Sequence, residues 1–295
     1  MIRHKLSSLG LPVLLGFCLI ARADQKVLYE KESRYNTIVV TEDDQGLRTL
    51  MFERHGPRQS VVKPGDPDHL ELAYARAMPV GLAFVDEPQS ALVIGLGGGT
   101  IPSFLHKHYP RMKIDAVDID PDVVRVAKEF FGFREDGALH AWVSDGRRFV
   151  EAGRDKYDLV FLDAYGPDSI PYRLATREFL QAVRRTLTPR GVVVGNLWSG
   201  QHNLLYDAML RTYQEVFDDL YVFEVQGSTN RILVALPRKQ PIERDDLAQR
   251  AAKLSEQKKF RCSLGDVVRD GYRHVAEKDP HARILTDKDE PASAR

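Results

Sequence analysis

The sequence predicts an α/β fold: a mainly parallel sheet covered by helices on both faces, ending in an antiparallel hairpin and preceded by a small β domain. After Gln89, continuous apolar runs alternate with amphipathic stretches, which is typical of parallel strands buried on both faces. The last two runs, "YVFEV" and "RILVAL", are separated only by "QGSTN", so they are expected to pair directly as a hairpin. Residues 27–52 instead alternate apolar and polar side chains around "EDDQG", which predicts a small antiparallel unit.

Composition limits the function classes that need to be considered. A chain of 295 residues, 43% hydrophobic and 28% charged, can bury a full core and carry a small appendage. Lys plus Arg and Asp plus Glu are equal at 42 each, so no summed field favours nucleic acid or an anionic membrane surface. The expected partner is a small neutral or zwitterionic molecule. Cys18 and Cys262 lack the spacing of a zinc or redox motif, so no metal site is expected.

The N-terminus has the pattern of a secretory signal peptide over residues 1–23. "MIRHK" supplies positive charge, "LSSLGLPVLLGFCLI" is apolar, and "ARA" before Asp24 resembles a cleavage site. The apolar run contains Pro12 and is shorter than the roughly 20 residues that a spanning helix needs, so no stable membrane anchor is expected. These features predict export to the periplasm or the medium if the segment is cleaved; the alternative localisation is cytoplasmic.

The mature chain is expected to form two domains. Residues 24–67 form the small β domain, and residues 68–295 the larger domain, which begins with a linking helix around "HLELAYARAM". Its strands are expected at "ALVIGL", "KIDAVDID", "LHAWVSD", "YDLVFLDAY" and "GVVVGNLW", followed by the hairpin. This order is the outline of a Rossmann-like sheet of the class I S-adenosylmethionine-methyltransferase type. Thr100 breaks the G-x-G-x-x-G/A fingerprint, which makes a nicotinamide dehydrogenase the least favoured interpretation.

A glycine-rich turn follows the first strand of that sheet in "ALVIGLGGGTIPSFL". Ligands of α/β sheets bind beyond the carboxyl ends of the strands, where glycines let backbone amides and a helix N-terminus approach them closely. The candidates are Gly95, Gly97, Gly98 and Gly99. The same glycines could simply permit a tight turn, so the motif is weak alone. No G-x-x-x-x-G-K-[ST] motif is present, which argues against a triphosphate cradle.

Carboxylates at the ends of the next two strands predict an adenine nucleoside as the ligand. Asp118, in "AVDIDP", lies about 20 residues beyond the glycines, where it can accept both hydrogen bonds of a ribose diol. Asp120 competes for this role but can also cap the helix that starts at Pro121. Asp145 and Gly146, in "SDG", can meet the exocyclic amine of adenine, although Asp145 can also be an N-cap.

The fourth strand ends in the most informative segment, "YDLVFLDAYGPDSIPYRLATREFL". Asp163 stands at its carboxyl end, after an apolar run and above the predicted pocket. Desolvating such a carboxylate is unfavourable unless it meets a cation or a hydrogen-bond donor. Because this edge of the sheet is where such folds place their sites, we expect Asp163 to have a functional role.

These motifs together resemble those of the spermidine synthase (polyamine aminopropyltransferase) family, from about Tyr29 to Val234. The matching segments are "ESRYNTIVV", "RQS", "ELAYARAM", "VIGLGGGT", "VDIDP", "SDGRRF" and "LDAY". The resemblance is closest to the branch whose loop reads like "DAYGPDSIP" and continues with "TREFL". It implies a nucleoside-binding catalytic domain, no tightly bound cofactor, and a homodimer joined partly through the small β domain.

The resemblance also implies roles for individual residues. It assigns Gln59 and Asp118 to contacts with the sugar and the sulfonium side chain of the nucleoside. It assigns Asp145 and Gly146 to contacts with adenine. Tyr74 would line the channel for the amine, and Asp163 would accept its proton. Tyr165, two residues after Asp163, is expected to contact the substrate. Thr100 stands where the family has an aspartate that grips an ammonium. Gly166 replaces a second loop aspartate, and Asp168 is the candidate to substitute for it.

Three activities remain open on this basis. An aminopropyltransferase would use decarboxylated S-adenosylmethionine and an amine such as putrescine, and would release methylthioadenosine. The sulfonium is the leaving group, so this chemistry needs no metal. A methyltransferase would use S-adenosylmethionine and release S-adenosylhomocysteine. A non-catalytic homologue would bind the nucleoside without turnover.

Overall fold

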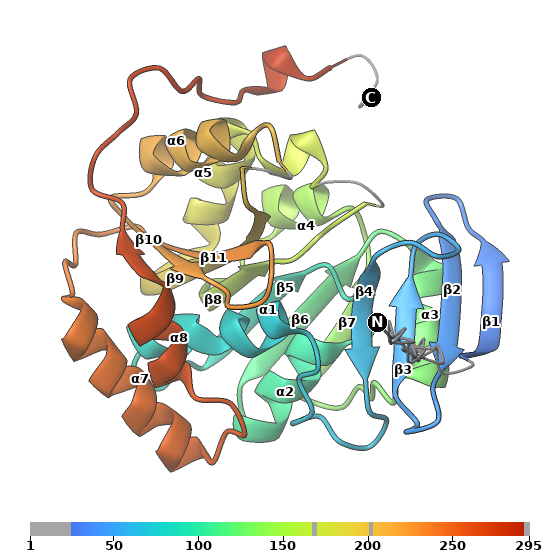
Figure 1. Cartoon of the computed structure of the whole chain (residues 1–295). Helices are drawn as coiled ribbons and strands as arrows, with labels where there is room; N and C mark the ends of the chain where they lie inside the picture. Colours follow the sequence, from blue (N-terminus) through green and yellow to red (C-terminus); the bar gives the residue numbers. More distant parts are fainter. Residues whose placement is uncertain (1–24, 167–169, 201–202, 292–295) are drawn as a thin grey trace, which may run out of the picture.

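A computed structural model describes residues 25–166, 170–200 and 203–291 and contains two sheets (Figure 1). The first is fully antiparallel, with its four strands in sequence order. Its strands are β1 (Lys26–Glu32), β2 (Thr37–Glu42), β3 (Arg48–Met51) and β4 (Arg58–Val62). The antiparallel unit predicted from residues 27–52 is confirmed, and β4 extends it by one strand. The Asp43 carboxylate accepts the backbone N–H groups of Gln45 and Leu47, which forms the predicted turn between β2 and β3.

The second sheet has eight strands in the order β12-β10-β11-β9-β8-β5-β6-β7. They are β5 (Ser90–Ile94), β6 (Lys113–Asp118), β7 (Leu139–Val143), β8 (Tyr157–Leu162), β9 (Leu187–Trp198), β10 (Asp219–Glu224), β11 (Asn230–Leu236) and β12 (Tyr272–His274). Strands β5 to β9 pair in parallel, and β10 and β11 form the predicted antiparallel hairpin. The predicted fold class is therefore confirmed. Strand β12 adds an antiparallel edge that the sequence did not predict.

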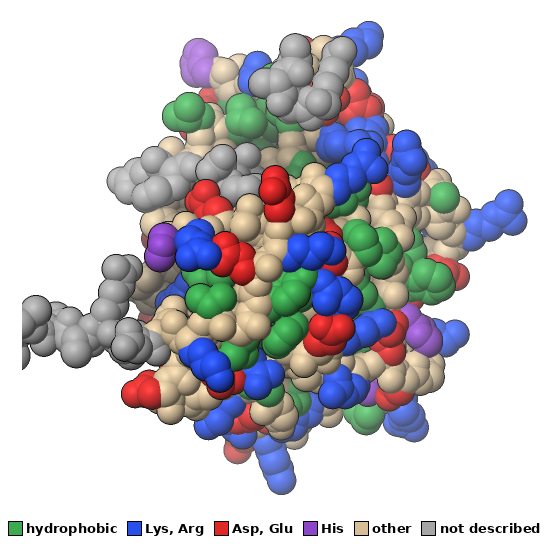
Figure 2. All heavy atoms as spheres, turned by 90° about the vertical axis from the view of Figure 1, so that its right-hand side faces the viewer, with side chains coloured by type: hydrophobic (Ala, Val, Ile, Leu, Met, Phe, Trp, Pro, Cys, Tyr) green, Lys and Arg blue, Asp and Glu red, His purple; other side chains and the backbone are tan. Residues whose placement is uncertain are grey.

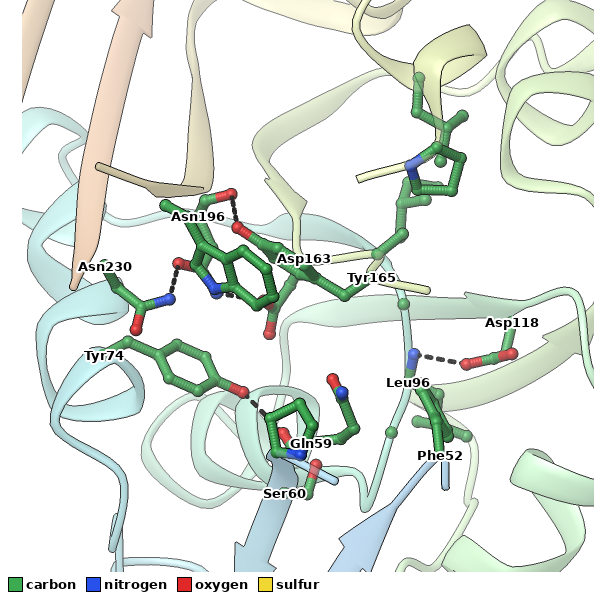
Figure 3. A pocket seen from close by; sticks show the side chains of 18 of the residues that line it. Phe52, Gln59, Ser60, Tyr74, Leu96, Asp118, Asp163, Tyr165, Asn196 and Asn230 are labelled. Atoms are coloured by element: carbon green, nitrogen blue, oxygen red, sulfur yellow. Dashed lines mark hydrogen bonds between the residues drawn. The ribbon is translucent and has the colours of Figure 1, made fainter. Parts of the chain in front are cut away.

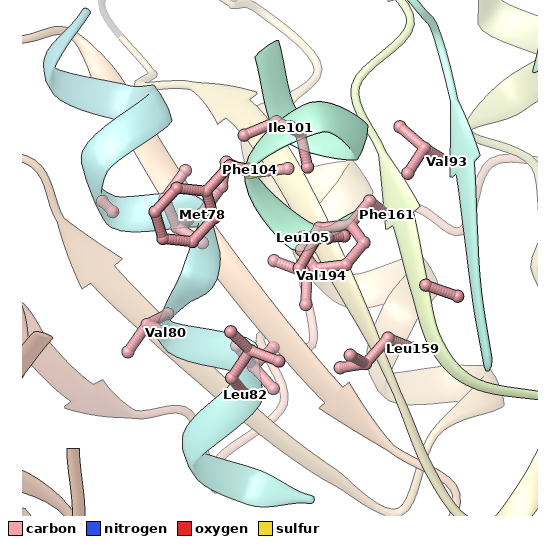
Figure 4. Close-up of a cluster of buried hydrophobic side chains, with 14 of the residues drawn as sticks. Met78, Val80, Leu82, Val93, Ile101, Phe104, Leu105, Leu159, Phe161 and Val194 are labelled. Atoms are coloured by element: carbon pink, nitrogen blue, oxygen red, sulfur yellow. The ribbon is translucent and has the colours of Figure 1, made fainter. Parts of the chain in front are cut away.

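Helices cover both faces of the large sheet (Figure 1). The α-helices are α1 (Ala73–Ala77), α2 (Thr100–His108), α3 (Pro121–Phe130), α4 (Gly146–Ala152), α5 (Arg177–Thr186), α6 (Tyr206–Val216), α7 (Arg244–Lys258) and α8 (Leu264–Gly271). The 3₁₀ helices are η1 (Met78–Phe84), η2 (Tyr172–Leu174) and η3 (Asp287–Asp289). Figure 4 shows part of the first core, where side chains of η1 and α2 pack against β5, β8 and β9. A second core lies on the other face, under α4, α5 and α6.

The linking helix is shorter than the sequence predicts. The helical pattern begins at Asp68, whereas α1 begins at Ala73 and passes directly into η1. Asp68 is buried, and its carboxylate contacts Lys107 and His108 at the end of α2. These tertiary contacts keep the residues between Asp68 and α1 out of a helix and override their local helical preference.

A third apolar cluster attaches the small sheet to the larger domain. Ile38, Val40 and Leu50 pack with Val123 and Val126 of α3. The small sheet thereby lies beside the end of the large sheet where β5 and β6 finish. Figure 2 views the molecule from this side and shows acidic and basic side chains intermixed around hydrophobic ones.

The predicted signal peptide, residues 1–23, lies outside the described residues. Within the described part of the chain, the helices are too short or too polar to cross a lipid bilayer.

Candidate active site

A cavity of about 470 Å³ opens where the carboxyl ends of the parallel strands meet β4 of the small sheet (Figure 3). Most of the residues predicted for the site line it: Gln59, Tyr74, Gly95, Gly97, Asp118, Asp145, Gly146, Asp163 and Tyr165. These residues come from segments far apart in the sequence, so the fold brings the separate motifs to one place. Asp168 lies outside the described residues.

The glycine turn lets β5 and β8 end close together. Gly95 has a φ of +97°, and a Cβ placed there would lie 2.3 Å from the carbonyl oxygen of Asp163. Only glycine fits both this backbone conformation and this close approach. The Asp163 N–H also donates to the carbonyl of Ile94 at 2.9 Å, which fixes the end of β8 against the turn.

Two of the predicted residues, Gly98 and Thr100, are not among the residues that line this cavity. The Gly98 N–H donates to Ser60 Oγ at 2.9 Å, so Gly98 joins the turn to the small sheet. Thr100 is the first residue of α2 and lines a separate cavity of about 190 Å³. Gly99 is the N-cap of α2, and the contact of Thr100 with a ligand ammonium stays a prediction.

Asp118 lies at the end of β6 with both carboxylate oxygens oriented by backbone donors. Oδ2 accepts the Leu96 N–H and Oδ1 accepts the Asp120 N–H, each at 3.0 Å. Burial raises the pKa of the Asp118 carboxyl, although these hydrogen bonds act in the opposite direction. Each oxygen can accept a second hydrogen bond, so the carboxylate can still receive two hydroxyl groups. Asp120 is buried and caps α3 by accepting the Asp122 N–H, which confirms the capping interpretation.

Asp145 both caps a helix and lines the cavity. Its Oδ1 accepts the Arg148 N–H at 2.9 Å in the first turn of α4. Its Oδ2 lies 3.4 Å from Arg173 Nη1, another group on the cavity wall. The two interpretations of Asp145 are therefore compatible. A ligand amine at Oδ2 would compete with Arg173.

Asp163 follows β8 directly and is held by one side-chain donor. Asn196 Nδ2 donates to its Oδ1 at 2.8 Å. Burial raises the pKa of Asp163 to about 7, and the hydrogen bond from Asn196 opposes this effect. The carboxyl group can therefore exchange a proton near neutral pH.

Aromatic side chains surround Asp163 (Figure 3). The Tyr74 hydroxyl donates to the Gln59 carbonyl at 3.0 Å, and the Tyr165 hydroxyl donates to the Asn196 carbonyl at 2.9 Å. The Tyr165 ring centroid lies 5.1 Å from that of Trp198. Burial and the nearby Asp163 charge raise the pKa of both tyrosines well above its ordinary value, so both phenols are neutral. The arrangement can orient an amine beside a proton acceptor.

Sequence reasoning missed three residues on this side of the cavity: Asn196, Trp198 and Asn230. The sequence does mark Asn196, because it is a polar residue inside the apolar run "GVVVGNLW". In the structure it is only 3% exposed. Asn230 lies in "QGSTN", where a polar residue is ordinary, so nothing marked it. Within the described ranges, no group of three or more His, Cys, Asp or Glu side chains is placed to hold a metal ion.

Comparison with known proteins places these features in context. A sequence profile described as the spermine/spermidine synthase domain matches residues 71–225. The chain is 33% identical to a polyamine aminopropyltransferase of Vibrio vulnificus, over 96% of this chain and 98% of that protein.

Solved structures have the same fold. A probable spermidine synthase from Corynebacterium glutamicum superposes with a TM-score of 0.70 at 20% identity, covering 88% of this chain and 96% of that one. Human methyltransferase-like protein 13, solved with S-adenosylhomocysteine, superposes with a TM-score of 0.56 at 29% identity, covering 71% of this chain and 97% of that one.

Proposed function

The chain belongs to the spermine/spermidine synthase family, and from this premise we propose that it is a polyamine aminopropyltransferase. It transfers the aminopropyl group of decarboxylated S-adenosylmethionine to an amine such as putrescine. The observation that carries the proposal is Asp163: a carboxylate with a pKa near 7, with one oxygen occupied by Asn196, on a cavity of suitable size.

The donor is a co-substrate that binds across the ends of β5, β6 and β7. Asp118 accepts the ribose hydroxyls, and Asp145 with Gly146 meets the adenine. Gln59 approaches from the small sheet, and Gly95 and Gly97 leave room for the sulfonium side chain. All these residues line the same cavity, which supports assigning them to one ligand.

The acceptor amine must lose a proton to react. A free alkylamine has a lysine-like pKa about 3 units above neutral pH, so exposing its lone pair costs roughly 4 kcal/mol. Asp163 lowers this barrier by accepting the proton and orienting the amine. The nitrogen lone pair then attacks the carbon beside the sulfonium, the carbon–sulfur bond breaks, and its electrons remain on sulfur as methylthioadenosine leaves.

The aromatic rings contribute to acceptor binding. Tyr74, Tyr165 and Trp198 line the cavity near Asp163. Their π faces attract an ammonium group, each by about 0.5 to 2 kcal/mol depending on desolvation. They therefore hold the acceptor before its proton is removed.

The proposal is tested by incubating the purified protein with decarboxylated S-adenosylmethionine and a panel of amines. Mass spectrometry should detect methylthioadenosine and an amine enlarged by one aminopropyl group. Asp163→Asn keeps the shape but removes the basicity, so turnover should fall by about 10² or more while methylthioadenosine affinity is kept. Near-normal turnover in this variant would remove Asp163 from its assigned role.

A methyltransferase is the second candidate, and two observations favour it. The human methyltransferase structure shares the fold at 29% identity, and Arg58 and Arg173 line the cavity where a donor carboxylate could be paired. Offering S-adenosylmethionine in the same assay separates the two activities, since S-adenosylhomocysteine would appear instead of methylthioadenosine. Nucleoside binding with neither product would indicate the non-catalytic alternative.

Assembly and export are further parts of the proposal. The domains divide at residues 67 and 68, the signal peptide is cleaved before Asp24, and two copies associate partly through the small sheet. Strand β1 is the outer strand of that sheet and leaves Val27 50% exposed, which supports a contact there. Light scattering of the purified protein tests the dimer, and N-terminal sequencing from the native host tests the cleavage.

A further inference from the structure

A chain of hydrogen bonds runs from the turn between β10 and β11 to the proposed base. Figure 3 labels three of its members, Asn230, Asn196 and Asp163. Ser228 Oγ lies 2.6 Å from Asn230 Oδ1 and donates to it. Asn230 Nδ2 donates to Asn196 Oδ1 at 2.8 Å, and Asn196 Nδ2 donates to Asp163 Oδ1 at 2.8 Å. Three consecutive donors therefore point toward Asp163.

The direction of this chain follows from the ionised carboxylate. An ionised carboxylate only accepts hydrogen bonds, so Asn196 must turn its NH₂ group toward Asp163. Its carbonyl oxygen then faces Asn230, which must in turn present its own NH₂ group. The Asn230 carbonyl is left for the Ser228 hydroxyl. Each amide orientation thus depends on the charge at the end of the chain.

Because Asn196 is buried, losing its hydrogen bonds would destabilise the folded state. Asn196 is 3% exposed and lies within the apolar strand β9. A buried amide is unfavourable in such surroundings unless its polar atoms have partners. Both ends of the Asn196 amide are satisfied, and its backbone carbonyl also accepts the Tyr165 hydroxyl.

Other groups near Asp163 do not replace Asn196 in this role. Tyr74 on α1 and Tyr165 after β8 are the ionisable neighbours, and both donate their hydroxyls to backbone carbonyls. The charged side chains elsewhere on the cavity wall are Arg58, Asp118, Asp145 and Arg173. Among the described residues, Asn196 is the side chain that donates to the Asp163 carboxylate.

We propose that Asn196 is a positioning residue that stabilises the ionised form of Asp163 and leaves Oδ2 free for the amine, and that Asn230 keeps Asn196 in this orientation. The reactive role of Oδ2 rests on the proposed function. The coupling of the two asparagines to the charge of Asp163 does not, because it follows from the hydrogen bonds alone.

The first test is the pH dependence of kcat/KM. Asn196→Leu keeps the branched shape of the side chain but removes the donor. The acidic limb of the kcat/KM profile should therefore move up by about one pH unit, a roughly tenfold loss of ionised carboxylate below the limb. Asn230→Asp sets a carboxylate against the Asn196 carbonyl and favours a reversed amide. The acidic limb of kcat/KM in Asn230→Asp should also move to higher pH. An unchanged acidic limb in both variants would overturn the proposal.

A second readout is independent of which group is transferred. The carboxyl titration of Asp163 can be followed by NMR in protein labelled with ¹³C at aspartate carboxyls, with the signal assigned from its loss in Asp163→Asn. Its midpoint should rise in Asn196→Leu and Asn230→Asp. The matched control is Gln214→Leu, which removes a buried amide whose partners among the described residues are the Val275 and Glu277 carbonyls.

The outcomes distinguish the positioning role of Asn196 from the proposed aminopropyl transfer. A midpoint that rises in the asparagine variants but not in Gln214→Leu supports the positioning role, even if the wild-type protein transfers no aminopropyl group. An unchanged midpoint in a folded Asn196→Leu protein contradicts it. If that variant does not fold, the midpoint of Asn230→Asp decides.

Discussion

At the scale of single residues, the chemistry depends on a carboxylate that is buried, where its charged form is unfavourable. Asp163 has a pKa of about 7 mainly because burial penalises its charged form. In the unfolded chain the same group titrates at its ordinary acidic pKa. The folded state is therefore penalised whenever the group is ionised, and function and stability make opposite demands on this position.

This conflict makes a prediction about stability. Above pH 7 the full penalty is present, up to about 4 kcal/mol for a pKa displaced by roughly three units. As the pH falls below 7 the folded carboxyl becomes protonated and the penalty shrinks, vanishing near pH 4. Asp163→Asn should thus be more stable than the wild type at pH 8, with the difference declining toward pH 5. Urea denaturation at both pH values measures it; a constant difference would show that burial does not set this pKa.

The sequence predicted where a residue lies in the sheet when an apolar run marks the strand. Asp118 and Asp163 end buried strands, and the sheet edge gives such positions a definite location. The sequence did not show that Thr100 lines a different cavity from Asp118 and Asp163, because a count of glycines does not reveal where the backbone enters α2. Asn230 could not be found, because its contribution depends on Asn196, a partner that only the folded sheet brings near it.

At the scale of elements, the turn between β5 and α2 holds the site together. It approaches the end of β8 through Gly95, and it bonds to β4 through the Gly98 N–H and Ser60 Oγ. The hairpin of β10 and β11 was predictable because the short polar connection between them has no room for a crossover helix, so the two strands must pair antiparallel. The shortened α1 was not, because contacts with α2 from distant residues decide where it begins.

The close approach at Gly95 gives the second prediction. In Gly95→Ala the new methyl group would meet the Asp163 carbonyl oxygen at 2.3 Å, with φ already at +97°. The variant should lose at least about 2 kcal/mol of folding free energy and most of its nucleoside affinity. Gly137→Ala is the matched control, because a Cβ there meets nothing within 4 Å. Equal denaturation midpoints for the two variants would mean that the strand ends move apart easily.

At the scale of the whole molecule, the cavity belongs to neither sheet alone. Gln59 and Ser60 reach it from β4, while Asp118 and Asp163 reach it from the large sheet. The sequence predicted both parts from their different periodicities. It did not predict how they meet, because the apolar residues of α3 and the small sheet resemble any other core residues, and the polar partners, such as Lys31 and Asp122, are far apart in the sequence.

A ligand that touches both sheets should hold them together. Openings that separate the small sheet from α3 would destroy the cavity, so a bound nucleoside stabilises the closed arrangement by RT ln(1 + [L]/Kd). At a methylthioadenosine concentration of 100 Kd this amounts to about 2.7 kcal/mol, or roughly 100-fold slower amide exchange through such openings. Hydrogen exchange with mass spectrometry should therefore show protection in peptides from β3 and β4 as well as in the glycine turn.

Two controls distinguish this coupling from a general effect. Peptides from α7, which lies away from the cavity lining, should exchange at the same rate with and without ligand. Asp118→Ala, tested at the same concentration of methylthioadenosine, should show protection reduced from roughly 100-fold to roughly tenfold or less, in β3 and β4 together with the glycine turn. Losing hydrogen bonds from a charged group weakens binding by about tenfold or more. If the turn were protected while β3 and β4 exchanged as before, the small sheet would dock independently of the nucleoside, and the cavity would be completed before the ligand arrives.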